Sequence, residues 1–192
     1  AIGEVEFAKL QGMDVIITDH HTCKDRLPTA AAAILNPKRP DCDYPFDALA
    51  GVGVAFKLIL ALAIKNGLKT TDVFNQYVDI ATLGTIADVV PLLGENRVIV
   101  DKGLKILHNP KRIGIRAVME VAGVLDKPLN ASTIAFSIAP RLNAADSAVR
   151  QQPLNCCLQM TKAVQENWHF YLILKIKNVS KPNVKYLTRH WN

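Results

Sequence analysis

Three adjacent polar residues, Asp19, His20 and His21, follow a short apolar run at residues 13–18, MDVIIT. The β-branched residues of this run predict a buried strand, and ligands of open α/β sheets bind beyond the carboxyl ends of strands. One carboxylate and two imidazoles in that place could bind a divalent metal ion and a phosphate group. The alternative is a polar exit from the strand with solvated histidines, and the three residues alone leave both interpretations open.

A further carboxylate, Asp88, lies in a nearly uncharged stretch at residues 84–92, GTIADVVPL. If it is buried, it must be paired, metal-bound or neutralised, because an isolated charge is costly away from water. The alternative is an exposed acid at the end of a helix. Asp88 is therefore the second candidate for a site residue.

Two more segments could hold phosphate oxygens. In residues 139–145, APRLNAA, Arg141 offers a bidentate fork and Asn143 a polar amide. A surface salt bridge is nevertheless the more common use of a single arginine. Residues 51–53, GVG, begin an apolar segment whose helix N-terminus could meet an anion, although two glycines there more often indicate close packing.

The elements that must position these residues are mostly helices. Periodicity and capping residues predict helices within residues 1–12, 54–64, 71–84, 95–107 and 114–122, and near Phe136. The one clear strand lies in residues 13–18, and one strand cannot make a sheet. Either further strands lie in residues 24–50 and 85–92, or the chain is a piece of a larger α/β domain, which its abrupt start within a helix favours.

The composition is that of a globular protein, with 192 residues, 49% hydrophobic, 21% charged and a formal net charge of +6. Disordered and collagen-like classes are therefore excluded. No run approaches ~18 consecutive apolar residues, so no membrane partner is expected, and no secretory signal is recognisable. The four cysteines lack the spacing of a zinc site. We expect a cytoplasmic protein with reduced thiols.

Residues 150–192 hold seven basic residues and one acid, whereas residues 1–149 hold 16 residues of each sign. The shift predicts a main domain over 1–149 and a basic connector or atypical tail over 150–192, with a helix at 157–176. The tail, which contains both tryptophans, could bind single strands by phosphate neutralisation and base stacking. The alternatives are a connector helix that exposes its basic face and an abnormal C-terminal reading frame.

Several longer motifs occur in an order that resembles the DHH phosphoesterase superfamily, and within it the RecJ-type single-strand-specific exonucleases. The resemblance covers roughly residues 1–145, and it implies an α/β fold with a parallel-sheet DHH domain, flanking helices and a helix-rich C-terminal part. The block around Asp88 and the segment 49–57 favour the RecJ type over the pyrophosphatases of the superfamily. The motifs are residues 12–21 GMDVIITDHH, 35–37 LNP, 44–45 YP, 49–57 LAGVGVAFK, 83–92 LGTIADVVPL, 95–97 ENR and 139–145 APRLNAA.

The resemblance also implies a role for each site residue. His20 and Asp88 would be ligands of one of two Mn²⁺ or Mg²⁺ ions. His21 would face the scissile phosphate, and Asp19 would orient an imidazole. The chemistry would be two-metal hydrolysis of phosphodiester bonds in single-stranded DNA, from the 5′ end, in DNA repair and recombination.

Two departures from the family pattern matter. The family's Asp-x-Asp motif and its lone Asp, both metal ligands, should precede residues 1–12 and are not present. Asp146-Ser147 stand where the family has Gly-Arg. We therefore expect a DHH catalytic domain truncated at both ends, with weak metal binding and little catalysis of its own. The alternatives are a DHH phosphodiesterase of short oligonucleotides or cyclic dinucleotides and a non-catalytic DHH-fold binding module.

Overall fold

The computed structural model of the protein describes residues 2–23 and 26–144. The expectations for the basic tail, its helix over 157–176, the boundary at residue 149 and the Asp146-Ser147 departure lie outside the described residues.

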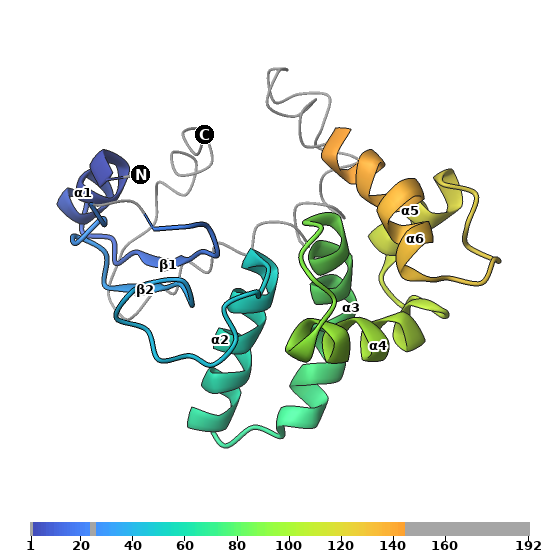
Figure 1. Cartoon of the computed structure of the whole chain (residues 1–192), viewed down its shortest axis with the longest axis horizontal. Coiled ribbons are helices and arrows are strands. Elements are labelled where there is room, and N and C mark those ends of the chain that lie inside the picture. Colours follow the sequence, from blue (N-terminus) through green and yellow to red (C-terminus); the bar gives the residue numbers. More distant parts are fainter. Residues whose placement is uncertain (1, 24–25, 145–192) are drawn as a thin grey trace.

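Over the described residues the chain is built from helices and one small sheet. α1 and the two strands lie at one end, α5 and α6 lie at the other, and α2, α3 and α4 lie between them (Figure 1). The elements are α1 (Ile2–Leu10), β1 (Ile16–Thr18), β2 (Ala33–Leu35), α2 (Gly51–Lys65), α3 (Thr70–Ala87), α4 (Gly94–Leu107), α5 (Ile113–Val121), α6 (Ala131–Thr133) and the π-helical turn η1 (Ile134–Ile138), after which helix continues to residue 144.

The two strands form a parallel sheet in which Ile16 is opposite Ala33 and Thr18 is opposite Leu35. The strand expected in residues 13–18 is confirmed as β1, and β2 lies within residues 24–50. Residues 85–92, the other place considered for a strand, instead contain the end of α3 and a turn. Because the strands are parallel, the residues that follow both of them lie at one edge of the sheet.

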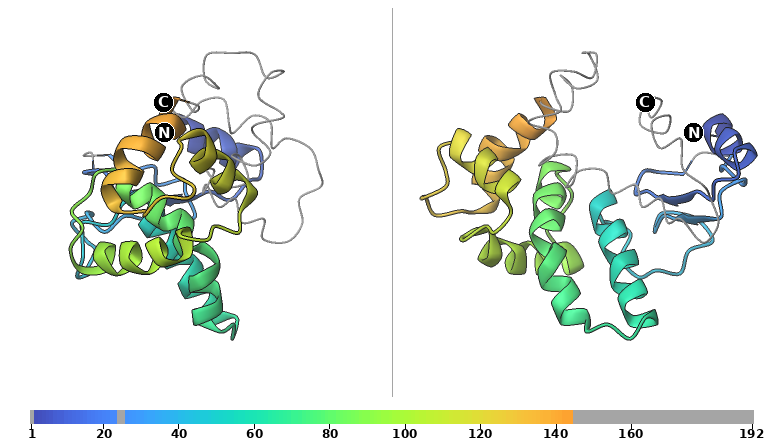
Figure 2. Two further views of the ribbon diagram at one scale, coloured as in Figure 1. Left: turned by 90° about the vertical axis from the view of Figure 1, so that its right-hand side faces the viewer. Right: turned by 180° about the vertical axis from the view of Figure 1, so that it is seen from behind.

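Two hydrophobic clusters share α3 between them. The first joins α3 and α4 to α5 and η1, and its most buried side chains include Leu107, Met119 and Ile134. The second joins α2 to α3 and α4 through residues such as Phe56 and Val78. α2 and α3 run side by side, joined by a short connection (Figure 2). α3 is therefore held on both sides, which fixes the position of its C-terminal end.

The crossing of α3 and α4 depends on Gly103. A Cβ atom at this position would lie 1.8 Å from Thr82 Oγ1 and 2.7 Å from the Val78 carbonyl oxygen. Thr82 is fully buried, and its hydroxyl donates a hydrogen bond to the Ile99 carbonyl oxygen at 2.9 Å. Thr82 therefore binds α4 directly, at a close approach that only glycine permits.

None of the helices in residues 2–23 and 26–144 combines the length and the apolar character that crossing a bilayer requires.

Candidate metal centre

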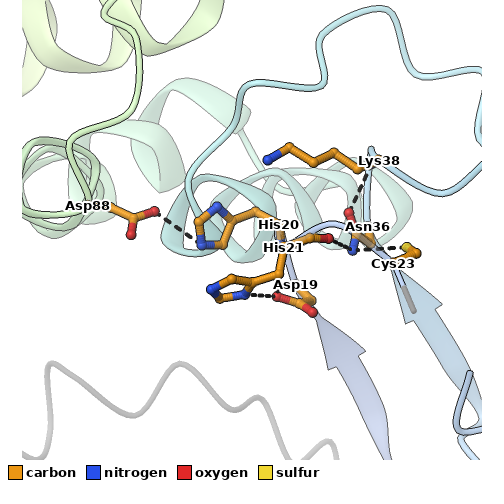
Figure 3. Close-up of polar contacts among 7 residues, drawn as sticks. All are labelled: Asp19, His20, His21, Cys23, Asn36, Lys38 and Asp88. Atoms are coloured by element: carbon orange, nitrogen blue, oxygen red, sulfur yellow. Dashed lines mark hydrogen bonds and ion pairs between the residues drawn. The ribbon is translucent and has the colours of Figure 1, made fainter.

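His20 and Asp88 come from distant parts of the sequence and meet at the C-terminal ends of β1 and α3. His20 Nε2 lies 3.2 Å from Asp88 Oδ2, and the two side chains are 15% and 38% exposed (Figure 3). Asp88 thus occupies the end of a helix, as one interpretation of the sequence expected, yet it is also paired. An imidazole nitrogen and a carboxylate oxygen are both donors that divalent metal ions accept.

The end of α3 is shaped to present Asp88 to the site. The Asp88 amide donates to the Gly84 carbonyl oxygen at 3.0 Å, which keeps Asp88 in the last helical turn. Val89 follows with φ of +56°, and its amide donates to Ile86 O at 3.2 Å. This left-handed residue ends the helix in the manner that glycine usually provides, and the chain turns away directly after Asp88.

Asp19 organises the other side of the site. Its Oδ1 accepts hydrogen bonds from the backbone amides of His20 and His21 at 2.7 and 3.2 Å, and it lies 2.7 Å from His21 Nδ1. The resemblance implied that Asp19 orients an imidazole, and in the structure its partner is His21. With Nδ1 bound to a carboxylate, Nε2 of His21 is left as the free nitrogen of a side chain that is 78% exposed.

Local electrostatics favour the ionised form of Asp19 and the neutral form of His20. Burial would raise the pKa of Asp19, but the hydrogen bonds from the side chain and amide of His21 and from the amide of His20 lower it below its usual range. Burial is the main reason that the pKa of His20 is lowered; the Asp88 carboxylate opposes this shift. A metal ion binds the neutral form of an imidazole, and the lowered pKa of His20 favours that form.

Asn36 supports the DHH segment from β2. It is 5% exposed, and its Nδ2 donates to the His21 carbonyl oxygen at 2.9 Å. Its Oδ1 accepts from the Lys38 amide, also at 2.9 Å. In the sequence, Asn36 stands out only as part of the motif at residues 35–37. One further signal points to this residue. Asn36 directly follows a short apolar run, and that run forms the strand that pairs with β1.

Glycine lets α2 approach the site closely. A Cβ atom on Gly51 would lie 3.3 Å from His20 Cδ2, and one on Gly84 would lie 2.7 Å from Val52 Cγ1. The N-terminal turn of α2 therefore packs against both the imidazole and the last turns of α3. This arrangement agrees with the close-packing interpretation of residues 51–53.

Asn96 is a second buried amide, which the sequence indicated only as part of the motif at residues 95–97. It is fully buried, and its Nδ2 donates to the carbonyl oxygens of Ala48 at 2.7 Å and Pro91 at 3.0 Å. One of these carbonyls precedes α2 and the other follows Asp88. Asn96 thus joins the segment that precedes α2 to the segment that follows Asp88.

The comparisons with known proteins agree with this arrangement. Residues 1–85 match the DHH family, N-terminal domain. The chain therefore carries a DHH family N-terminal domain over these residues. It is 43% identical over 153 residues to the single-stranded-DNA-specific exonuclease RecJ of Bacillus subtilis (80% of this chain, 18% of that protein). It is 44% identical over 152 residues to the RecJ of Escherichia coli (73% and 26%). The chain therefore spans about a quarter or less of the length of these relatives.

A solved structure shares the fold of this DHH chain. The crystal structure of exonuclease RecJ bound to manganese superposes with a TM-score of 0.63 at 32% identity, covering 88% of this chain and 43% of that one. The predicted family and the predicted α/β class with a parallel sheet are thus confirmed. The individual roles of the site residues and the two-part division of the chain stay predictions.

Within the described residues, Arg141 and Asn143 are not bonded to the DHH residues. Both are exposed, and Arg141 Nη1 donates to the Ser137 carbonyl oxygen at 2.6 Å within its own helix. Over residues 2–23 and 26–144, no hydrogen bond or ion pair joins either of them to Asp19, His20, His21 or Asp88. Their phosphate-binding role stays a prediction.

The donors fit one part of a metal site. His20 and Asp88 supply one nitrogen and one oxygen ligand, a mixture that suits Mn²⁺ or Mg²⁺ better than a thiolate metal. Within the described ranges, no group of three or more His, Cys, Asp or Glu side chains could hold a metal ion. The described part of this chain therefore presents two ligands of the kind required, fewer than an octahedral ion needs.

Proposed function

We propose that this chain carries part of the catalytic centre of a metal-dependent exonuclease that hydrolyses phosphodiester bonds of single-stranded DNA, in repair and recombination. The observation that carries the proposal is the pairing of His20 Nε2 with Asp88 Oδ2 at 3.2 Å, in a DHH chain similar to RecJ. RecJ of B. subtilis is named as a single-stranded-DNA-specific exonuclease, and a RecJ structure contains manganese, which supports both the substrate and the ion.

His20 and Asp88 would hold one divalent ion, Mn²⁺ or Mg²⁺. When bound, such an ion activates water and stabilises the negative charge that develops on the phosphoryl oxygens. His21 would contact the scissile phosphate through Nε2, because Asp19 occupies its Nδ1. Asp19 fixes the ring orientation of His21, so Nε2 is the nitrogen that faces the phosphate before substrate binds.

Metal binding by these two ligands alone should be weak. We expect Mn²⁺ to bind the isolated chain with a dissociation constant well above that of a complete dinuclear site, and nucleotide release to be slow. The full activity belongs, in this proposal, to a protein in which further carboxylates complete the centre.

The test measures Mn²⁺ binding by calorimetry and Mn²⁺-dependent release of nucleotides from a 5′-phosphorylated single-stranded oligonucleotide. His20→Ala and Asp88→Asn should abolish both signals, whereas Asp126→Asn, an exposed acid in another part of the chain, should leave both unchanged. Mn²⁺ binding that survives both site substitutions would refute the proposed ligands. Faster cleavage of a dinucleotide than of a long strand would favour the short-oligonucleotide phosphodiesterase.

A non-catalytic binding module is the second candidate. The shortage of metal ligands within the described residues favours it. In that case the folded chain would bind the oligonucleotide equally well with Mn²⁺ and with a chelator, and it would release no nucleotides.

A further inference from the structure

Lys38 is a cation beside the DHH segment that no carboxylate neutralises within the described residues. It is exposed and follows β2, two positions after Asn36. Its neighbour Arg39 is paired with Asp41: the Nε and Nη2 atoms donate to the two carboxylate oxygens at 2.8 and 2.5 Å. Over residues 2–23 and 26–144, the ion pairs of the structure leave Lys38 Nζ without such a partner.

The backbone of Lys38 is fixed relative to the site by one buried amide. Asn36 accepts the Lys38 N–H at 2.9 Å and donates to the His21 carbonyl oxygen at 2.9 Å. Because Asn36 is buried and bonded at both ends, the loop after β2 and the DHH segment keep a constant separation. The Lys38 side chain extends from this loop toward the His20 end of the site (Figure 3).

Lys38 and the metal-ligand residue His20 lie on the same side of the site (Figure 3). A cation in this place opposes the binding of a second cation, so it does not serve the metal. It suits an anion that approaches the metal side of the site, and an ammonium group is a common point-charge ligand of phosphate.

We propose that Lys38 binds a phosphate oxygen of the single-stranded substrate beside the phosphodiester bond that is cut. This inference rests on the proposed function and adds a substrate contact to it. Asn36 is its positioning residue, since the same side chain holds both the DHH segment and the Lys38 backbone. The Lys38 contact supplies binding energy to the strand and takes no part in proton transfer.

Removal of a cation should weaken the binding of a phosphate group but should not weaken the binding of a metal ion, so the test measures both affinities. Lys38→Gln should weaken binding of a 5′-phosphorylated oligothymidylate by roughly 3- to 10-fold at low salt in the presence of Mn²⁺. The slope of log K against log salt should fall by about 0.7, the value for one phosphate contact on a single strand. The Mn²⁺ affinity without DNA should stay equal or become tighter.

Lys65→Gln is the matched control, because Lys65 is also exposed but lies at the far end of α2 from Gly51, which contacts His20. It should leave oligonucleotide binding within about twofold of the original chain, which is the small effect of a distant surface charge. Lys38→Arg should retain most of the affinity. Fluorescence anisotropy over a range of salt concentrations, with calorimetry for Mn²⁺, provides both readouts.

Three results would overturn the inference. Equal losses of oligonucleotide affinity in the Lys38→Gln and Lys65→Gln variants would show that Lys38 contributes only a general surface charge. A joint loss of DNA binding, Mn²⁺ affinity and melting temperature would give Lys38 a structural role only. If Lys38→Gln binds DNA as the original chain does, the Lys38 contact is wrong. A chain whose DNA binding is indifferent to His20→Ala and to Mn²⁺ instead refutes the proposed function itself.

Discussion

At the residue scale, Val89 has a backbone conformation that its side chain disfavours. Its φ of +56° lies in the left-handed region, where a β-branched residue is strained by roughly 1–2 kcal/mol. The side chain is 85% exposed, so burial within the described chain does not compensate for this cost. The strain lies directly beside Asp88, where backbone strain is typical of functional sites.

Replacing Val89 with glycine should stabilise the folded chain. Relief of the left-handed strain outweighs the extra freedom of glycine in the unfolded state, and we expect a gain of about 1 kcal/mol in the free energy of unfolding. Urea denaturation measures it. The matched control is Val98→Gly, an exposed valine within α4, which should instead lose about 0.5–1 kcal/mol. A loss at both positions would show that Val89 carries no strain.

At the element scale, the site depends on where α3 ends relative to α2 and β1. α3 is fixed against α4 by the close approach at Gly103 and against α2 by the contact of Gly84 with Val52. Asn96 then fixes the segment after Asp88 by its bond to the Pro91 carbonyl oxygen. The position of Asp88 thus follows from helix packing more than from any bond that Asp88 itself makes.

Gly103→Ala should disrupt the crossing of α3 and α4. The new Cβ would meet the Thr82 hydroxyl and a backbone carbonyl, and neither can move without separating the helices. We expect a loss of about 3 kcal/mol in the free energy of unfolding, together with weaker Mn²⁺ binding because Asp88 shifts. Gly3→Ala in α1 is the control: nothing lies within 4 Å of its added Cβ, so stability should rise by up to about 1 kcal/mol. Equal effects in thermal melts would contradict the role of the crossing.

At the scale of the whole molecule, a half-buried polar cluster joins the loop after β2 to α2 and α4. Tyr44 Oη donates to Glu95 Oε1 at 2.5 Å, and Lys57 Nζ lies 2.8 Å from Glu95 Oε2. Beside it, a cavity of about 530 Å³ lies between the loop and α2, and both Tyr44 and Lys57 line it. The cluster therefore bonds the loop after β2 to α2 and α4 beside this cavity.

The pH dependence of stability should report this cluster. Burial raises the pKa of Glu95, but the bonds from Lys57 and Tyr44 lower it to a net value below the ordinary 4.5. A carboxyl with a depressed folded pKa contributes stability above pH 4.5 and loses it as the pH falls through the folded pKa. Glu95→Gln should thus cost at most about 1 kcal/mol at pH 7, because the pair is partly exposed, and progressively less below pH 4.5.

Chemical denaturation between pH 3 and pH 7 measures this difference. Glu120→Gln, an exposed acid on α5, is the control and should shift stability equally little at every pH. A Glu95→Gln difference that grows as the pH falls would contradict the assigned direction of the pKa shift.

The sequence by itself determined the local elements and the family. The β-branched run before Asp19 predicted β1 and placed the DHH residues at its carboxyl end, because alternation and branching act on the local backbone. The helices were readable for the same reason, since the 3.6-residue period marks the face that each one buries. The order of the motifs then indicated the DHH family.

Only the tertiary structure decided which polar atoms meet. The 3.2 Å approach of His20 to Asp88 and the bonds of Asn36 and Asn96 join residues that no local period relates. The same holds for Thr82 and Gly103, whose contact depends on how two helices cross. A hydrophobic pattern specifies a buried face but leaves the partner open, and a polar side chain finds its partner only after packing has fixed the distances between elements.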